Sequence, residues 1–304
     1  MRLVTRSDFD GIVCAVLLKE LEIADEIFLS HPKDLQDGKI PITSNDVLAN
    51  VPYVEGCGLW FDHHSSEEER LNLEGKFEGA SRAAPSTARV IYEYYNGAER
   101  LSKFDKLMKY VDLADAGQFT EDDILNPKRW VLLAFLCDPR TGLGYHRSYR
   151  ISNKQLMSVL VDHIRTMDID QILELPDVKE RVDRYFDMNE VHKNFLHKHS
   201  YTDGPVVVTD SRGVTDIPPG NRFLIYPLYP DTNISIRIID GKNKEFAAVS
   251  VGYSITNRTS NVDVGSLLLK YGGGGHKQVG TCQVPYADAD RVVKEVIEAI
   301  KAQS

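Results

Sequence analysis

One carboxylate and two imidazoles follow a short hydrophobic run, and all three side chains are of types that bind metal ions. Asp62, His63 and His64 come directly after Leu59–Phe61, a run that predicts a buried strand. Ligand-binding side chains of an open α/β sheet gather at the carboxyl ends of strands, so this position favours a metal or phosphate site. A histidine alone is more often solvated or hydrogen-bonded, so the interpretation depends on partners elsewhere in the chain.

Three further carboxylates could be those partners. Asp8 and Asp10 lie between a strand predicted to end at Arg6 and a helix predicted from Ile12. In an extended turn, carboxylates two residues apart can face the same side, which suits a divalent cation, whereas helix capping explains only one of them. Asp115 ends another predicted helix, where its charge opposes the helix dipole and a metal would compensate it.

A run of four glycines in the last part of the chain predicts a phosphate-binding site. Glycines let backbone amides approach an anion closely, and the basic side chains beside the run would complete a phosphate cradle. A flexible turn is the alternative interpretation of such a run. The predicted substrate-binding residues are Arg258, Gly273, Gly274, Gly275, His276 and Lys277.

Three other segments carry weaker signals. Pro85–Thr87 begins a predicted helix whose free amides could hold a phosphate, although a hydroxyl N-cap is the simpler account. Arg140–Arg150 is a basic and aromatic loop in an acidic protein, and it either contacts phosphates or bases or is an ordinary surface loop. The charged segment Glu67–Arg70 is expected to be merely solvated.

Composition limits the partners and the compartment. The chain has 304 residues, of which 42% are hydrophobic, enough for two ordinary cores. A formal net charge of -9 at pH 7 gives no overall basic field, so neither long DNA nor a membrane is an expected partner. The four cysteines lack C-x-x-C spacing and no signal peptide is recognised, so we expect a protein of the reducing cytoplasm.

The order of the predicted elements indicates the fold class. Strands alternate with helices in the first half, which predicts an α/β domain with a parallel or mixed sheet. Long polar helices are predicted next, and then a smaller α+β domain. The helices are predicted over 153–167 and 177–199, and the later strands over 206–208, 222–229, 233–239 and 246–253.

Taken together, the motifs resemble the DHH phosphoesterase family with a C-terminal DHHA1 domain. Asp8–Gly11 resembles the first motif of that family, and Asp62–His64 resembles the motif that names it. Asp115–Phe119 is similar to a later acidic motif, and Gly272–Lys277 to the glycine-rich DHHA1 signature. Relatives include exopolyphosphatase-related proteins, oligoribonucleases, pAp phosphatases and RecJ exonucleases.

The resemblance implies a domain organisation and a cofactor. A DHH domain would cover residues 1–175, a helical linker 176–202 and a DHHA1 substrate-binding domain 203–304, with a cleft between the two domains. The implied cofactor is Mn²⁺, as one or two ions, with Mg²⁺ as the alternative. A homodimer formed through an exposed hydrophobic helix face is left open.

The resemblance also implies a role for each residue. Asp62 would orient a histidine, and His64 would contact the scissile phosphate or its leaving oxygen. Arg258, His276 and Lys277 would hold the substrate away from the cut. The implied metal ligands are Asp8, Asp10, His63 and Asp115.

Two departures from the family pattern affect the metal centre. Many relatives have a histidine shortly before the first acidic pair, whereas Val4–Ser7 precedes it here. The family also expects a metal-bridging Asp at the end of the strand before the DHH strand. Asp46 lies at the predicted beginning of that strand, about 13 Å of extended chain from its end, where Asn50 stands.

Two functions of different class follow. The first is a metal-dependent phosphoesterase or phosphodiesterase that uses a metal-activated water on nanoRNA, a linear or cyclic dinucleotide or pAp, with polyphosphate as a further alternative. The second is a nucleotide- or phosphate-binding regulatory protein with a degenerate metal centre. The retained acids and imidazoles favour the enzyme, because a binding module has little use for them, and Asn50 favours the binding protein.

Overall fold

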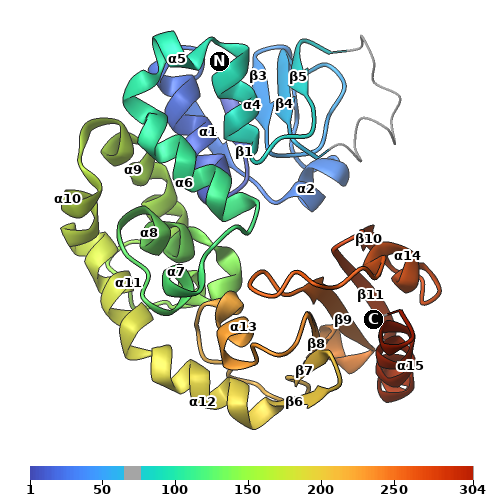
Figure 1. The fold of residues 1–304 in the computed structure, drawn as a ribbon. Coiled ribbons are helices and arrows are strands. Elements are labelled where there is room, and N and C mark those ends of the chain that lie inside the picture. Colours follow the sequence, from blue (N-terminus) through green and yellow to red (C-terminus); the bar gives the residue numbers. More distant parts are fainter. Residues whose placement is uncertain (65–76, 304) are drawn as a thin grey trace. The chain divides into compact units, whose positions relative to one another are not determined.

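The computed structural model describes residues 1–64 and 77–303, so the segment Glu67–Arg70 lies outside the described residues (Figure 1). Contacts divide the chain into two compact units. Unit 1 comprises Met1–Gln118 and Pro127–Tyr185, and unit 2 comprises Phe119–Asn126 and Phe186–Ser304. The domain boundaries implied by the family resemblance stay a prediction.

Unit 1 is built on a five-stranded sheet in the order β2-β1-β3-β4-β5, and every pairing in it is parallel. The central strands are buried on both faces, as expected for a parallel sheet covered by helices. Because β2 and β3 lie on opposite sides of β1, the chain changes direction there, and such a switch point is where α/β sheets bind ligands. The strands are β1 (Arg2–Thr5), β2 (Glu26–Leu29), β3 (Asp46–Ala49), β4 (Leu59–Asp62) and β5 (Gly79–Ser81).

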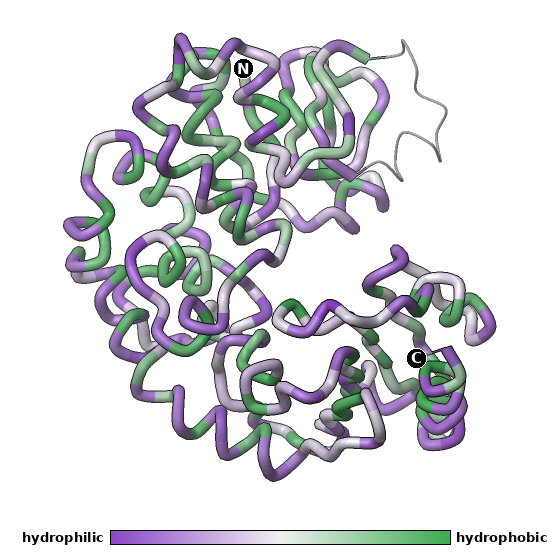
Figure 2. Tube along the Cα trace, in the orientation of Figure 1, coloured by the Kyte–Doolittle hydropathy of each residue, from purple (hydrophilic) through white to green (hydrophobic). Residues whose placement is uncertain are grey.

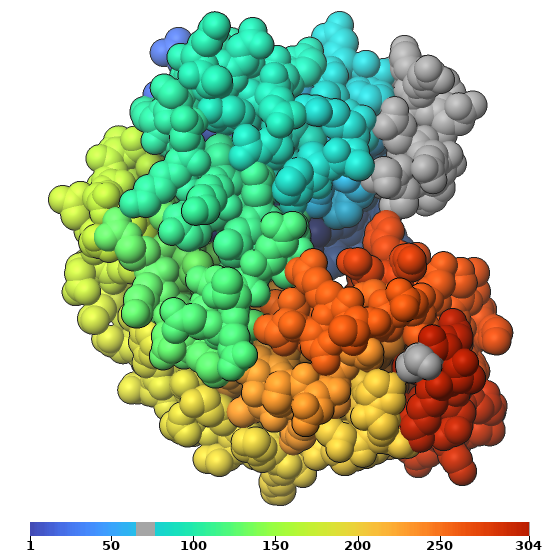
Figure 3. Space-filling model, in the orientation of Figure 1, coloured from blue at the N-terminus to red at the C-terminus, as the bar shows by residue number. Residues whose placement is uncertain are grey.

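Helix α1 (Phe9–Glu20) places the first acidic motif against this sheet. Its residues from Phe9 to Leu18 are all buried, and Figure 2 shows it as mostly hydrophobic. In Figure 3, the cyan-to-green residues that include α4 to α6 cover most of the dark-blue residues to which α1 belongs. The start of the helix packs so closely against the preceding turn that only a glycine fits at position 11. A Cβ there would lie 2.1 Å from the carbonyl oxygen of Arg6.

The other helices of unit 1 pack around α1 and the sheet, and α6 ends at Asp115 as the sequence predicts. The single helix predicted over 177–199 is wrong in one respect, since it is interrupted at Met188 and forms α11 and α12. None of the helices in residues 1–64 and 77–303 has the length and hydrophobicity needed to cross a bilayer. The helices of unit 1 are α2 (Pro32–Gln36), α4 (Thr87–Tyr94), α5 (Gly97–Arg100), α6 (Asp105–Asp115), α8 (Arg129–Cys137), α9 (Asn153–Thr166), α10 (Ile169–Glu174) and α11 (Pro176–Asp187).

Unit 2 contains a six-stranded mixed sheet in the order β10-β11-β9-β8-β7-β6, in which only β7 and β8 pair in parallel. Its hydrophobic core joins one face of this sheet to α14 and α15. The strands are β6 (Ser200–Asp203), β7 (Val206–Asp210), β8 (Ile234–Asp240), β9 (Phe246–Tyr253), β10 (Gly274–His276) and β11 (Val279–Pro285). The helices are α7 (Glu121–Leu125), α12 (Asn189–His199), α13 (Ile225–Leu228), α14 (Val264–Leu269) and α15 (Ala289–Lys301).

The strand predicted over 222–229 is wrong. These residues form a 3₁₀ turn followed by α13, and the Asn221 side chain begins the turn by accepting a hydrogen bond from the Phe223 amide at 3.0 Å. A short hydrophobic run does not distinguish a buried strand from a buried helical turn, so the sequence pattern alone was insufficient.

Candidate metal centre

Three of the four predicted metal ligands come together at the carboxyl-terminal edge of the parallel sheet. Asp10, His63 and Asp115 each offer a ligand atom, and these atoms lie within 4.8 Å of one another. They come from the first turn of α1, the residue after β4 and the end of α6. The fourth predicted ligand, Asp8, is not part of this group.

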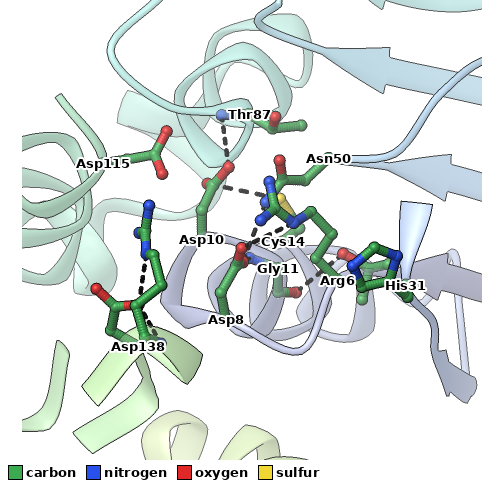
Figure 4. Close-up of polar contacts among 12 residues, drawn as sticks. Arg6, Asp8, Asp10, Gly11, Cys14, His31, Asn50, Thr87, Asp115 and Asp138 are labelled. Atoms are coloured by element: carbon green, nitrogen blue, oxygen red, sulfur yellow. Dashed lines mark hydrogen bonds and ion pairs between the residues drawn. The ribbon is translucent and has the colours of Figure 1, made fainter. Parts of the chain in front are cut away.

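Asp10 is held in place by the start of α4. Its carboxylate is buried and accepts hydrogen bonds from the Thr87 and Ala88 amides at 3.0 and 2.9 Å (Figure 4). Ser86 caps the same helix by accepting from the Arg89 amide at 3.0 Å, which confirms the hydroxyl N-cap. The first amides of α4 therefore bind a carboxylate of the protein. Phosphate binding by these amides was the alternative that the sequence allowed.

His63 presents one ring nitrogen to this group. Its Nδ1 lies 3.1 Å from the Ala84 carbonyl oxygen, and because a carbonyl only accepts, Nδ1 carries the proton. Its Nε2 is buried, lies 3.1 Å from Asp115 Oδ2 and lacks a hydrogen-bond partner among the described residues. This tautomer leaves the Nε2 lone pair for a metal ion, as in metal-binding histidines whose other nitrogen donates to a backbone carbonyl.

Crowded negative charge favours a cation at the group. Burial raises the pKa of Asp10, although the nearby His63 opposes that rise. Burial and the charges of Asp10 and Asp8 also raise the pKa of Asp115 well above its ordinary value, even though part of its side chain stays accessible to solvent. The carboxylate and imidazole donors, the free Nε2 and this repulsion together fit a divalent ion of the Mn²⁺ or Mg²⁺ type.

Asp62 and His64 form a second pair beside the group. The Nδ1 of His64 lies 2.9 Å from Asp62 Oδ1, so the histidine that Asp62 orients is His64. Burial by itself would lower the pKa of His64, but the hydrogen bond and the charge of Asp62 raise it above its ordinary value. The role of His64 toward a substrate stays a prediction.

Asp8 has other partners. It caps α1, where its Oδ1 accepts from the Gly11 amide at 3.0 Å and from Asn50 Nδ2 at 3.1 Å. Its Oδ2 lies 3.1 Å from Arg6 Nε. Asn50 follows the end of β3, and Asp46 lies at the beginning of that strand, where it pairs with Arg2. Both positions are as the sequence predicts.

One arginine of the basic loop belongs to the surroundings of the site. Arg140 pairs with Asp138 at 2.8 Å and interacts electrostatically with Asp8 and Asp115. Arg150, at the other end of the loop, pairs with Asp177. Sequence reasoning marked this loop as basic without selecting Arg140, because the signal is the proximity of the acidic group in the fold.

The substrate-binding residues predicted in unit 2 lie on β10, in the turns beside it and, for Arg258, in the loop after β9. Arg258 donates from Nε to the Ile255 carbonyl oxygen at 3.1 Å, and His276 and Lys277 are exposed. Gly273 and Gly275 have a packing role, because a Cβ at these positions would lie 2.4 Å from the Thr281 carbonyl oxygen and 2.2 Å from the Val279 carbonyl oxygen on the neighbouring β11. Phosphate binding by this segment stays a prediction.

Comparisons with known proteins agree with the fold and the motifs. The solved pGpG-specific phosphodiesterase PggH from Vibrio cholerae is 46% identical to this chain, and the match covers 100% of this chain and 99% of that one with a TM-score of 0.84. RecJ of Thermus thermophilus in complex with Mn²⁺ is 12% identical over 99% of this chain and 52% of its own, with a TM-score of 0.54, which shows a shared fold alone. No protein-family model matches the sequence.

A curated relative is more distant. The A-adding tRNA nucleotidyltransferase of Aquifex aeolicus is 23% identical over 239 residues, or 79% of this chain. The match covers 24% of that protein, so the chain spans about a quarter of its length.

A parallel sheet with two carboxylates and an imidazole gathered at its carboxyl-terminal edge, followed by a mixed-sheet unit, is the architecture expected of a DHH domain followed by a DHHA1 domain. The chain belongs to the DHH phosphoesterase family.

Proposed function

We propose that this protein is a divalent-metal-dependent phosphodiesterase that hydrolyses a short linear dinucleotide of the pGpG type. The observation that carries the proposal is the 46% identity, over essentially the whole of both chains, to a pGpG-specific phosphodiesterase. The group formed by Asp10, His63 and Asp115 supports a metal-dependent reaction. Mn²⁺ is the proposed ion, with Mg²⁺ as the alternative.

The proposed mechanism assigns separate tasks to the residues at the sheet edge. Asp10, His63 and Asp115 would hold the ion, which when bound supplies the Lewis acidity that activates water and offsets the charge on the phosphoryl group. His64, oriented by Asp62, would contact the scissile phosphate and give a proton to the leaving oxygen as the P–O bond breaks. Arg258, His276 and Lys277 of unit 2 are the proposed contacts to the remainder of the substrate.

A regulatory binding protein is the second candidate, and the specific observation in its favour is the neutral Asn50 beside Asp8. A hydrolysis screen with Mn²⁺ separates the two candidates. The panel is pGpG, another linear dinucleotide, a cyclic dinucleotide, pAp, short RNA and polyphosphate. We expect pGpG to be cleaved fastest, with loss of activity in a chelator and recovery on adding Mn²⁺.

Tight binding of pGpG without turnover would favour the regulatory protein. Faster turnover of pAp, of short RNA or of polyphosphate would replace the proposed substrate and keep the enzyme class.

A further inference from the structure

The carboxylate of Asp8 is already occupied by hydrogen-bond donors. Its Oδ1 accepts from the Gly11 amide and from Asn50 Nδ2, and its Oδ2 faces Arg6 Nε. Each of these groups directs a hydrogen at an oxygen that would otherwise coordinate a metal ion. A second ion on Asp8 would have to displace a guanidinium and an amide donor.

The orientation of Asn50 follows from its chemistry. With the amide turned over, its Oδ1 would face the Asp8 carboxylate and two acceptors would repel each other, so Nδ2 points to Asp8. The Oδ1 of Asn50 is buried without a hydrogen-bond partner among the described residues. This single neutral oxygen is a weaker ligand than a carboxylate, and the cation of Arg6 lies on the other oxygen of Asp8.

Arg6 interacts with other groups of the site besides Asp8. Its positive charge also interacts with Asp115 and His64, which belong to the metal group and the adjacent histidine pair. About a third of the Arg6 side chain, 35%, is accessible to solvent, so the side chain is not sealed in the core.

A single divalent ion balances the charges of the site. Asp62 is counted with His64, its ion-pair partner. The remaining three carboxylates, those of Asp8, Asp10 and Asp115, carry three negative charges when ionised, and one divalent ion with the Arg6 guanidinium carries three positive charges. Arg140, which also lies near Asp8 and Asp115, is paired with Asp138. A second divalent ion would leave the site with excess positive charge, which costs free energy where the groups are partly buried.

We propose that the centre of this protein binds a single divalent ion on Asp10, His63 and Asp115, and that Arg6 is a positioning residue that takes the place of a second ion by neutralising Asp8. The inference rests on the proposed function only in that a divalent ion binds. It departs from the two-ion alternative that the family resemblance leaves open.

Metal stoichiometry of the full chain tests the proposal without using activity. The metal-free protein is titrated with Mn²⁺ in a calorimeter, and bound metal is counted by elemental analysis after gel filtration. Wild type and Arg6→Lys, which keeps the positive charge, should bind one ion per chain. The double variant Arg6→His with Asn50→Asp, which supplies two ligands and removes the cation, should bind two.

Arg165→Gln is the matched control, since Arg165 pairs with Glu20 at the other end of α1 and should leave the count at one. Two ions in the wild type would overturn the proposal, and that result requires no variant to fold. Two ions in Arg6→Lys, or one ion in a double variant that circular dichroism shows to be folded, would equally overturn it.

Failure of this proposal and failure of the proposed function are distinguishable. One ion per chain with no hydrolysis of any substrate in the panel would refute the enzyme and leave the single-ion centre standing. Two ions per chain with rapid cleavage of pGpG would refute the single-ion centre alone.

Discussion

His63 Nε2 lies 3.1 Å from Asp115 Oδ2, which joins the end of β4 to the end of α6. The Ala84 carbonyl fixes the opposite side of the imidazole, so the ring is oriented before any ion binds. Preorganisation of this kind lowers the cost of metal binding, because the ligand's rotamer and tautomer need not change.

The pair gives the first prediction. His63→Ala and Asp115→Ala should each weaken Mn²⁺ binding and lower kcat/KM by more than about 100-fold, since loss of a ligand should exceed the 10–100-fold typical of an orienting partner. Calorimetric titration and steady-state kinetics on pGpG measure the two effects. His163→Gln, a change on α9 outside the group, is the control. Full activity of either alanine variant would contradict the assigned roles.

The second prediction concerns the hydrogen bond between Asp62 and His64. Asp62→Asn keeps the shape of the side chain and removes the charge that orients His64, so kcat should fall about 10- to 100-fold with little change in KM. Kinetics on pGpG at saturating Mn²⁺ check this. A change confined to KM would mean that Asp62 serves binding and not the chemical step.

The third prediction concerns Ser86, the N-cap of α4. Ser86→Ala removes the acceptor for the Arg89 amide, loosening the turn whose amides hold Asp10, and should lower the free energy of unfolding by about 1–2 kcal/mol and weaken Mn²⁺ binding. Ser152→Ala removes the N-cap of α9, so it should also lower the free energy of unfolding but leave Mn²⁺ affinity unchanged. Urea unfolding and calorimetry supply the comparison, and equal metal affinity in both variants would separate α4 from the site.

The residues of unit 2 give the fourth. Arg258→Ala should raise KM for pGpG about tenfold, the effect of losing one charge-assisted hydrogen bond, while kcat stays close to wild type. The exposed Arg291 of α15, paired with Glu295 and Asp288, gives the control Arg291→Ala. An unchanged KM across the substrate panel would remove Arg258 from the substrate contacts.

His192 gives the fifth, which concerns pH. Burial lowers the pKa of His192 below its ordinary value of 6.5, and its Nδ1 lies 2.9 Å from the Pro218 carbonyl oxygen. The unfolded chain therefore binds this proton more readily than the folded protein, so stability should fall as pH drops below about 6.5. Urea midpoints near pH 7.5 and pH 5.5 should differ less in His192→Gln than in wild type. An identical difference in both would show that another group causes the loss.

The sequence predicted the elements that carry the site wherever local pattern determines local structure. The hydrophobic run that ends in Asp62 forms the strand that the pattern predicted, and Asp8 before a buried apolar helix forms an N-cap. The placement of Asn50 at a strand end, with Asp46 at the beginning, also follows from the extent of one apolar run. These features depend on residues close together in the chain.

The partners of those side chains were decided by the tertiary structure. Contact of Asp10 with the Thr87 amide, of Asn50 with Asp8 and of His63 with Asp115 requires segments far apart in the sequence to meet. Hydrogen bonds and ion pairs are short-ranged, so they exist only once the order β2-β1-β3-β4-β5 has made the right strand ends neighbours. The sequence by itself supplied the candidate ligands, and only the fold distinguished Asp10, which faces the metal group, from Asp8, which faces Arg6.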